Sequence, residues 1–169
     1  MSSPSITAVG DGSTYRVYAV PIEAPSFGAR TLLADPAAAS ASPFGWLDTN
    51  GAAGAEFTTT QGNNAHAYTD LNDDDLPDAG SSPSGGAGLD FDFPIDLTLQ
   101  PSTYRPAAVT NLFYFNNYIH DFAHVYGFDE SNGNFQENNY GNGGLGSDYV
   151  YAEAQDGGGT NNANFGTPN

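Results

Sequence analysis

The stretch that decides the fold runs from Thr110 to Phe165 and reads TNLFYFNNYIHDFAHVYGFDESNGNFQENNYGNGGLGSDYVYAEAQDGGGTNNANF. It opens as an aromatic-rich pattern with apolar residues three to four positions apart, typical of an amphipathic helix. Gly and Asn then dominate from residue 132 to 146, which predicts a long ordered loop. Residues 148–154 predict a strand and residues 161–165 a second one, with a glycine-rich turn between them.

The helix is expected from Pro106 to Tyr126. Pro106 suits the first helical turn, where the missing N–H has no helical partner. Gly127 stands where a left-handed C-terminal cap belongs. The apolar positions that recur at helical spacing are Val109, Leu112, Phe113, Ile119, Phe122 and Tyr126.

Two strands are expected upstream of this helix. Residues 14–20 alternate in the strand manner, and residues 89–96 alternate apolar and acidic side chains up to a break at Pro94. Between them, residues 21–62 carry repeated Pro, Ala, Gly and Ser, which predicts an irregular segment. The only tryptophan, Trp46, is expected to anchor the core.

Composition predicts a single loop-rich domain over residues 1–169, since 13% aromatic residues supply burial while Gly and Pro are abundant. The chain has 20 acidic residues but only three arginines and no lysine, which gives a net charge of -17. Such a charge repels phosphate backbones, so we expect no nucleic-acid partner. No apolar run is long enough to span a membrane, and the absence of cysteine excludes disulfides and thiolate zinc sites.

Residues 69–88 form an acidic stretch that predicts a surface loop binding calcium. Oxygen-bearing residues alternate there, and calcium takes six to eight oxygen ligands. The pattern resembles the D-x-D-x-D-x-x-x-D loops of extracellular calcium-binding repeats, and a bare loop of clustered carboxylates would repel itself. The expected ligands are Asp70, Asn72, Asp74, Asp78 and the carbonyl of Leu76. The alternative is a solvated acidic loop without an ion.

Several short motifs, which occur in a fixed order, resemble those of the fungalysin-type zinc metallopeptidases. They are Asn116-Asn117-x-x-His120-Asp121, Gly127-Phe128-Asp129-Glu130, Gly133-Asn134-Phe135-Gln136, Ala154-Gln155-Asp156-Gly157 and Asn161-Asn162-Ala163-Asn164-Phe165, with Ala41-Ser42-Pro43-x-Gly45-Trp46 and Gly62-Asn63-Asn64-Ala65-x-Ala67 upstream.

The resemblance implies an α+β fold, the N-terminal half of a thermolysin-like domain: a twisted, mainly antiparallel sheet, one long amphipathic helix and long Gly/Asn-rich loops. It implies part of a secreted zinc metalloendopeptidase. The HExxH zinc helix of the family does not occur in the 169 residues. We therefore expect the chain to be inactive alone, with zinc held only in the complete family domain and a peptide substrate or the missing C-terminal half as partner.

His120 and His124 stand four residues apart on the expected helix, with Asp121 following the first, which imitates the spacing of a zinc helix. In the resemblance, however, these residues match a helix well upstream of the zinc helix. The prediction is a buried histidine with a hydrogen-bonding neighbour.

The motif Asn161-Asn162-Ala163-Asn164-Phe165 resembles the edge strand through which thermolysin-like peptidases pair with an extended substrate. The resemblance assigns substrate binding to Asn162 and Ala163. The alternative function is a non-catalytic extracellular module that binds calcium and self-assembles into oligomers or filaments through an exposed sheet edge.

Overall fold

Five short strands and one long α-helix make up the main regular structure of residues 10–160, the part of the chain that the computed structural model describes. Single-turn 3-10 helices lie between them. The bounds are β1 (Thr14–Val17), η1 (Pro25–Phe27), β2 (Thr31–Ala34), β3 (Ala65–Thr69), η2 (Gly86–Gly88), β4 (Asp90–Phe91), η3 (Pro101–Thr103), α1 (Arg105–Val125), η4 (Glu130–Asn132) and β5 (Val150–Ala154). The predicted α+β class is confirmed.

Within the described residues the strands form two small sheets. The first has the order β2-β1-β4, in which β1 pairs antiparallel with β2 and parallel with β4. The second pairs β3 and β5 in parallel, with Tyr68 opposite Glu153. The expectation of one mainly antiparallel sheet is therefore wrong for this part of the chain. Both parallel pairs join strands far apart in sequence, and a parallel pairing requires such a crossover, whereas a hairpin would have given antiparallel strands.

The first expected strand ends early. Strand β1 stops at Val17 because the next amide, that of Tyr18, donates to the side chain of Asn111 on α1 at 2.8 Å. The chain thus leaves the sheet to join the helix.

The strand expected over residues 89–96 is reduced to β4. The carbonyl of Phe93 accepts a hydrogen bond from Arg30 at 2.8 Å instead of from a neighbouring strand. The next residue, Pro94, has no N–H to donate to a ladder. Pairing therefore does not extend past Phe91.

Helix α1 begins and ends within one residue of its predicted bounds, with Pro106 in the first turn. Its C-terminus is a Schellman motif: the amide of Phe128 donates to the carbonyl of Ala123 (3.1 Å) and that of Gly127 to His124 (3.0 Å). Gly127 adopts a φ of +94°, a conformation that glycine reaches without strain. No helix among residues 10–160 combines the length and apolar character needed to cross a membrane.

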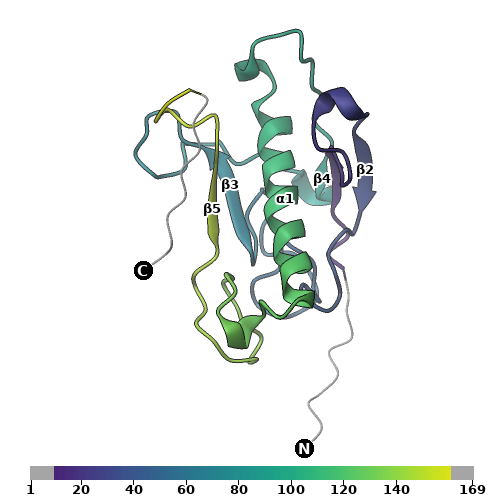
Figure 1. Cartoon of the computed structure of the whole chain (residues 1–169), viewed down its shortest axis with the longest axis vertical. Coiled ribbons are helices and arrows are strands. Elements are labelled where there is room, and N and C mark those ends of the chain that lie inside the picture. Colours follow the sequence, from purple (N-terminus) through teal and green to yellow (C-terminus); the bar gives the residue numbers. More distant parts are fainter. Residues whose placement is uncertain (1–9, 161–169) are drawn as a thin grey trace, which may run out of the picture.

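Figure 1 shows α1 along the long axis of the molecule, with β3 and β5 on one side and β2 and β4 on the other. The helix contacts β1, β3 and β5, so it joins the two sheets. The core between them is aromatic: the ring of Tyr15 stacks on Phe91 at 5.0 Å and lies 5.5 Å from Trp46 and 5.9 Å from Phe113. All four residues are buried, which confirms Trp46 as a core anchor.

The apolar stripe expected on α1 is only partly buried. Val109 and Phe113 lie in the core, whereas Ile119, Phe122 and Tyr126 are exposed. In the C-terminal half of the helix the buried face is polar instead, since Asn117 and Asp121 take the inward positions.

Asp121 is the centre of this polar interior. Its buried carboxylate accepts hydrogen bonds from the amide of Ala38 (2.8 Å), the hydroxyl of Ser42 (2.7 Å) and the indole N–H of Trp46 (2.9 Å). All three donors belong to the irregular segment that follows β2. One carboxylate on α1 thus orders a stretch that has no regular structure of its own.

The start of β3 joins the same network. The side-chain amide of Asn64 donates to the Ser42 hydroxyl (3.0 Å) and to the Asn117 side chain (3.1 Å). Just before it, a Cβ on Gly62 would lie 1.8 Å from the carbonyl oxygen of Trp46. Only glycine allows this close approach of two backbones.

We predict that Asp121→Ala destabilises the chain by about 3 kcal/mol or more, because several buried donors lose their acceptor at once. Trp46→Phe, which removes one donor, should cost less than Asp121→Ala. Chemical denaturation followed by circular dichroism measures both. The control is Asp92→Ala, which removes a carboxylate from the solvent-exposed pair with Arg16 and should have a much smaller effect. Equal losses for Asp121→Ala and Asp92→Ala would contradict a central role for Asp121.

A second buried carboxylate, that of Asp48, is less well satisfied. One oxygen accepts from the amide of Gly51 (3.0 Å) and the hydroxyl of Tyr140 (3.3 Å), while the other has no hydrogen-bond partner among the described residues. Burial raises the pKa of Asp48 to about 6, and the nearby charge of Glu56 raises it further, against the hydrogen bonds from Gly51, Tyr140 and Ala52, which lower it. Ionised Asp48 is therefore a source of instability at neutral pH.

Because the pKa of Asp48 is higher in the folded chain than in the unfolded chain, its contribution to stability is full below about pH 4 and is lost as pH rises through about 6. Asp48→Asn should raise Tm at pH 7.5 by about 3 °C, the shift that ~1 kcal/mol gives at this size. The gain should vanish near pH 4. The control Asp96→Asn removes an exposed carboxylate whose pKa is lowered by hydrogen bonds from Thr98, and should bring no gain at pH 7.5. A gain for Asp48→Asn that does not change with pH would contradict the titration.

Candidate functional site

The acidic loop predicted to bind calcium follows β3 directly, and residues 71–77 are all exposed. Its two ends are tied together, since the amide of Asp78 donates to the carbonyl of Thr69 at 3.1 Å. The Asp78 carboxylate in turn accepts from the amide of Leu71 (2.9 Å) and the hydroxyl of Thr69 (3.2 Å). The loop is therefore closed at its base by Asp78.

Asp70, the first residue after β3, is fully buried and organises the inside of the loop. One carboxylate oxygen accepts from the amide of Asp74 (3.2 Å) and the other from the amide of Asp75 (2.7 Å). Asp73 and Asp75 take left-handed conformations, with φ of 59° and 58°, which allows the chain to wrap around Asp70.

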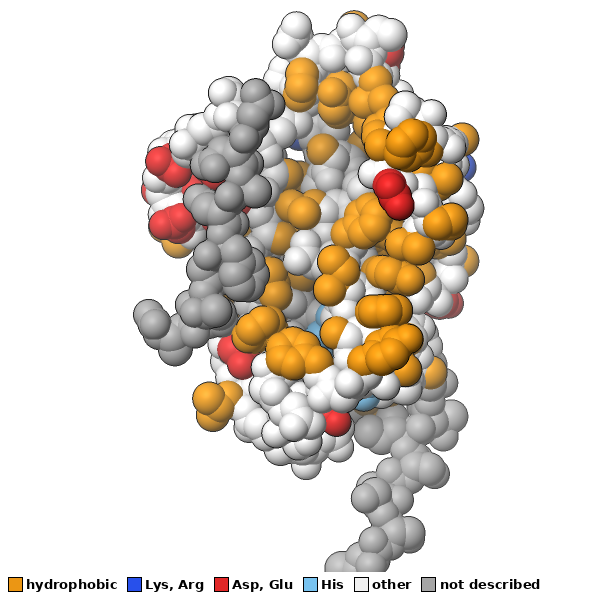
Figure 2. Space-filling model, in the orientation of Figure 1, with side chains coloured by type: hydrophobic (Ala, Val, Ile, Leu, Met, Phe, Trp, Pro, Cys, Tyr) orange, Lys and Arg blue, Asp and Glu red, His pale blue; other side chains and the backbone are white. Residues whose placement is uncertain are grey.

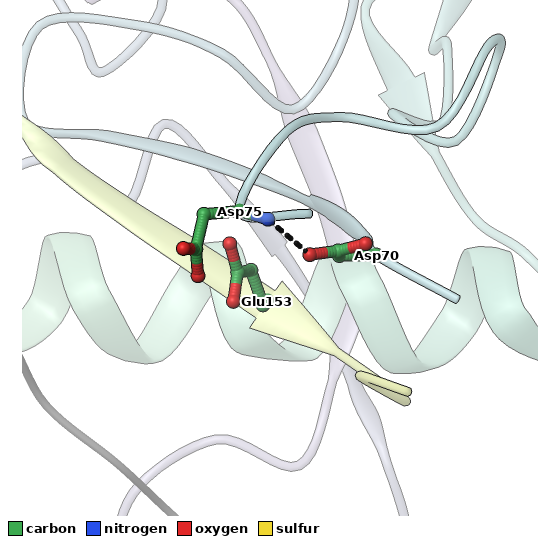
Figure 3. A group of neighbouring side chains, drawn as sticks. All are labelled: Asp70, Asp75 and Glu153. Carbon is green, nitrogen blue, oxygen red and sulfur yellow. Dashed lines mark hydrogen bonds between the residues drawn. The ribbon is translucent and has the colours of Figure 1, made fainter. Parts of the chain in front are cut away.

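Three carboxylates converge beside this loop: Asp70, Asp75 and Glu153 (Figure 3). Each offers an oxygen, and these oxygens lie within 4.8 Å of one another. Calcium binds oxygen at about 2.3–2.6 Å, so two ligands on opposite sides of one ion are separated by about twice that distance. Glu153 comes from β5, and the parallel pairing of β3 with β5 brings it to the loop.

The electrostatics of Glu153 favour a cation. Burial raises the pKa of Glu153, and the charges of Asp70, Asp156 and Asp75 raise it further, against a hydrogen bond from the Tyr68 hydroxyl (2.9 Å). A bound cation would reduce the repulsion among these carboxylates. Among the described residues, no Lys or Arg forms a salt bridge with Asp70, Asp75 or Glu153.

The converging group differs in part from the ligand set predicted from the sequence. Asp70 belongs to both. Asp74 instead caps the amide of Leu76 (3.1 Å) and accepts from the side chain of Asn72 (2.7 Å), while Asp78 closes the loop base. Asp75 and Glu153 were not predicted. For Glu153 the only signal would have been the pairing of β3 with β5, which joins residues more than 80 positions apart.

The two histidines of α1 have protein partners. The ring of His120 lies between Asp121 (3.1 Å) and the side-chain oxygen of Gln136 (2.9 Å), which confirms the predicted buried, hydrogen-bonded histidine. His124 contacts the carboxylate of Glu130 at 3.2 Å. The ring nitrogens of the two histidines thus contact different protein partners, although their spacing imitates that of a zinc helix.

The loop after α1 is ordered by these contacts. Gln136 also accepts a hydrogen bond from the side chain of Asn134 (2.8 Å), and its backbone amide donates to Asp148 (2.9 Å), just before β5. The amide of Asn138 donates to the Asn63 side chain at 2.8 Å. The predicted ordered loop is confirmed. Asn162 and Ala163, assigned to substrate binding, lie outside the described residues.

Comparison with known proteins identifies the family. The model of the fungalysin metallopeptidase (M36) family matches residues 14–169. The chain is 42% identical to the extracellular metalloproteinase MEP of Fusarium vanettenii over 95% of its own length and 25% of that protein. It is also 42% identical to extracellular metalloproteinase 5 of Trichophyton tonsurans, over 92% of this chain and 25% of the relative, and to the extracellular metalloproteinase mep of Aspergillus flavus, over 91% and 24%. The chain spans about a quarter of the length of these relatives, and it belongs to the fungalysin metallopeptidase (M36) family.

Proposed function

We propose that this chain is a portion of a secreted zinc metalloendopeptidase, to which it contributes the sheets, the helix α1 and the substrate-binding edge strand. The observation that carries the proposal is the family match over residues 14–169. The relatives are named extracellular metalloproteinases, which supports an extracellular location. The substrate class is peptides, because the family consists of peptidases.

The zinc ligands and the catalytic base belong, in this proposal, to a part of the family domain that the 169 residues do not contain. The sequence has no HExxH word, and both histidines of α1 are engaged by protein partners. The chain would contribute Asn162 and Ala163, which hold an extended peptide by strand addition. This assignment is supported by the resemblance of residues 161–165 to the edge strand of such peptidases.

We also propose a structural calcium ion at the acidic loop, with Asp70 as the central ligand. Asp75 and Glu153 are the converging carboxylates, while Asn72, Asp74, Asp78 and the carbonyl of Leu76 are the candidates from the sequence pattern. The ion would tie the loop after β3 to β5. Extracellular modules bind calcium at about 10⁻⁴–10⁻³ M, which suits a site that relies on few charged ligands.

The alternative function is a non-catalytic extracellular module that binds calcium and self-assembles into oligomers or filaments. One observation favours it: the three converging carboxylates all belong to this chain, so the candidate calcium site needs no other part of a peptidase. Calcium-dependent assembly without any partner would distinguish this alternative from the peptidase portion.

The isolated chain should not hydrolyse casein, with or without added zinc, because the 169 residues contain no HExxH motif. The measurement is release of labelled peptides from casein by the purified chain, with a chelator as control. Chelator-sensitive hydrolysis that His120→Ala abolishes would contradict the proposal and would assign the metal to α1.

Calcium should raise the Tm of the chain. A ligand at 100 times its Kd stabilises the folded state by about 2.7 kcal/mol, which corresponds to a gain of several degrees at this size. Glu153→Gln, which retains an acceptor for Tyr68 but removes the charge, should lose most of the gain. Differential scanning calorimetry with calcium and with chelator gives the answer.

Asp74→Ala separates the two ligand sets. If Asp74 binds the ion, this variant loses the calcium-dependent gain; if only the converging group binds it, the gain remains. Glu56→Gln, in a different loop, is the matched control and should respond like the parent chain. An unchanged melting curve for the parent would leave the acidic loop as a solvated surface.

A further inference from the structure

The outward face of α1 is apolar and open to solvent. Ile119 is 59% exposed, Phe122 54%, Val125 68% and Tyr126 78%. Figure 2 shows hydrophobic side chains gathered along this face of the molecule. The opposite face of the helix packs on β1, β3 and β5, and that covered face is apolar in the N-terminal half and polar around Asn117 and Asp121.

The rings on this face form a ladder with a spacing of four residues. Tyr118 stacks on Phe122 with ring centroids 6.3 Å apart, and Phe122 contacts Tyr126 at 4.9 Å. The ladder starts from Tyr114 in the core, 5.9 Å from Tyr118. Because each ring is held by the next, the face is ordered before any partner binds, which lowers the entropic cost of binding.

The charge pattern of α1 is unusual for a surface helix. The chain has 20 acidic residues, yet the only Lys, Arg, Asp or Glu residues in α1 are Arg105, its first residue, and Asp121, which is buried. A helix at the surface of a soluble protein normally carries charged residues on its outer face, whereas an apolar surround is typical of a buried helix. Helix α1 itself thus contributes no exposed acidic side chain to this face.

We propose that Tyr118, Ile119, Phe122, Val125 and Tyr126, the aromatic strip, form the docking face for the remainder of a fungalysin-type domain. The inference rests on the proposed function, and the relatives support it because they are about four times as long as the segment they share with this chain. The partner must present apolar side chains and no unpaired charge. A second copy of the chain is disfavoured, because each copy carries a net charge of -17.

Co-expression tests the docking face. The tagged full chain is produced together with the part of the Fusarium vanettenii metalloproteinase that follows the segment aligned with it. The expected result is co-purification in a 1:1 ratio. Phe122→Glu combined with Tyr126→Glu should lower the recovered partner at least 10-fold, because the carboxylates would be buried without a counter-charge. The matched control is Phe27→Glu, which changes an exposed phenylalanine on η1 and should leave recovery unchanged.

Folding and docking are separated by the Tm of each variant alone, which should equal that of the parent because the changed side chains are exposed. As a milder variant, Tyr126→Trp places an indole on the strip, and the partner should protect its fluorescence from acrylamide. Failure of the parent chain to recover partner, recovery that survives the double substitution, or a homodimer of the parent that the double substitution dissolves would each overturn the inference. A 1:1 complex without chelator-sensitive hydrolysis of casein would count against the proposed function and leave the docking face intact.

Discussion

The carboxylate of Asp121 is the constraint on which the rest of the structure depends. It accepts hydrogen bonds from Ala38, Ser42 and Trp46, and so holds on α1 a segment that has no regular structure. Trp46 then reaches the aromatic core around Tyr15, where the two sheets and the helix meet. A chain whose short strands form few backbone hydrogen bonds relies on such buried polar contacts. Breaking one leaves a buried polar group unpaired, which costs more free energy than the bond contributes net to stability.

Several motifs that relate this chain to the fungalysin family contribute residues to this polar interior. Asn117 and Asp121 belong to the motif on α1, and Asn64 to the motif just before β3. The motif in the loop after α1 supplies Gln136, whose side chain hydrogen-bonds to the buried ring of His120. These motifs therefore supply residues that stabilise the fold, whereas the zinc chemistry of the family requires other residues. Within this framework His120 and His124 hydrogen-bond to Gln136 and Glu130.

Sequence patterns predicted α1 almost to the residue, because its Pro start, Gly127 cap and helical spacing are local signals. The sequence also predicted Trp46 as a core anchor, because a single large aromatic residue is usually buried. Sequence patterns did not give the parallel pairing of β3 with β5, since strand order depends on contacts between distant segments. Glu153 was missed for that reason, as it meets Asp70 only through this pairing. The sequence did not predict the exposure of Phe122 either, because helical periodicity shows that a face is apolar but not that the core covers it.

A chimera tests most directly the claim that this chain is the framework and substrate edge of a fungalysin-type peptidase. In it, the present sequence replaces the aligned quarter of the Fusarium vanettenii metalloproteinase, to which it is 42% identical. The measurement is hydrolysis of casein by the purified chimera at equal zinc content to the parent enzyme. The account predicts chelator-sensitive hydrolysis that is reduced when Asn162→Ala is introduced into the grafted sequence. A folded, zinc-loaded chimera without hydrolysis, or one indifferent to Asn162→Ala, would contradict it.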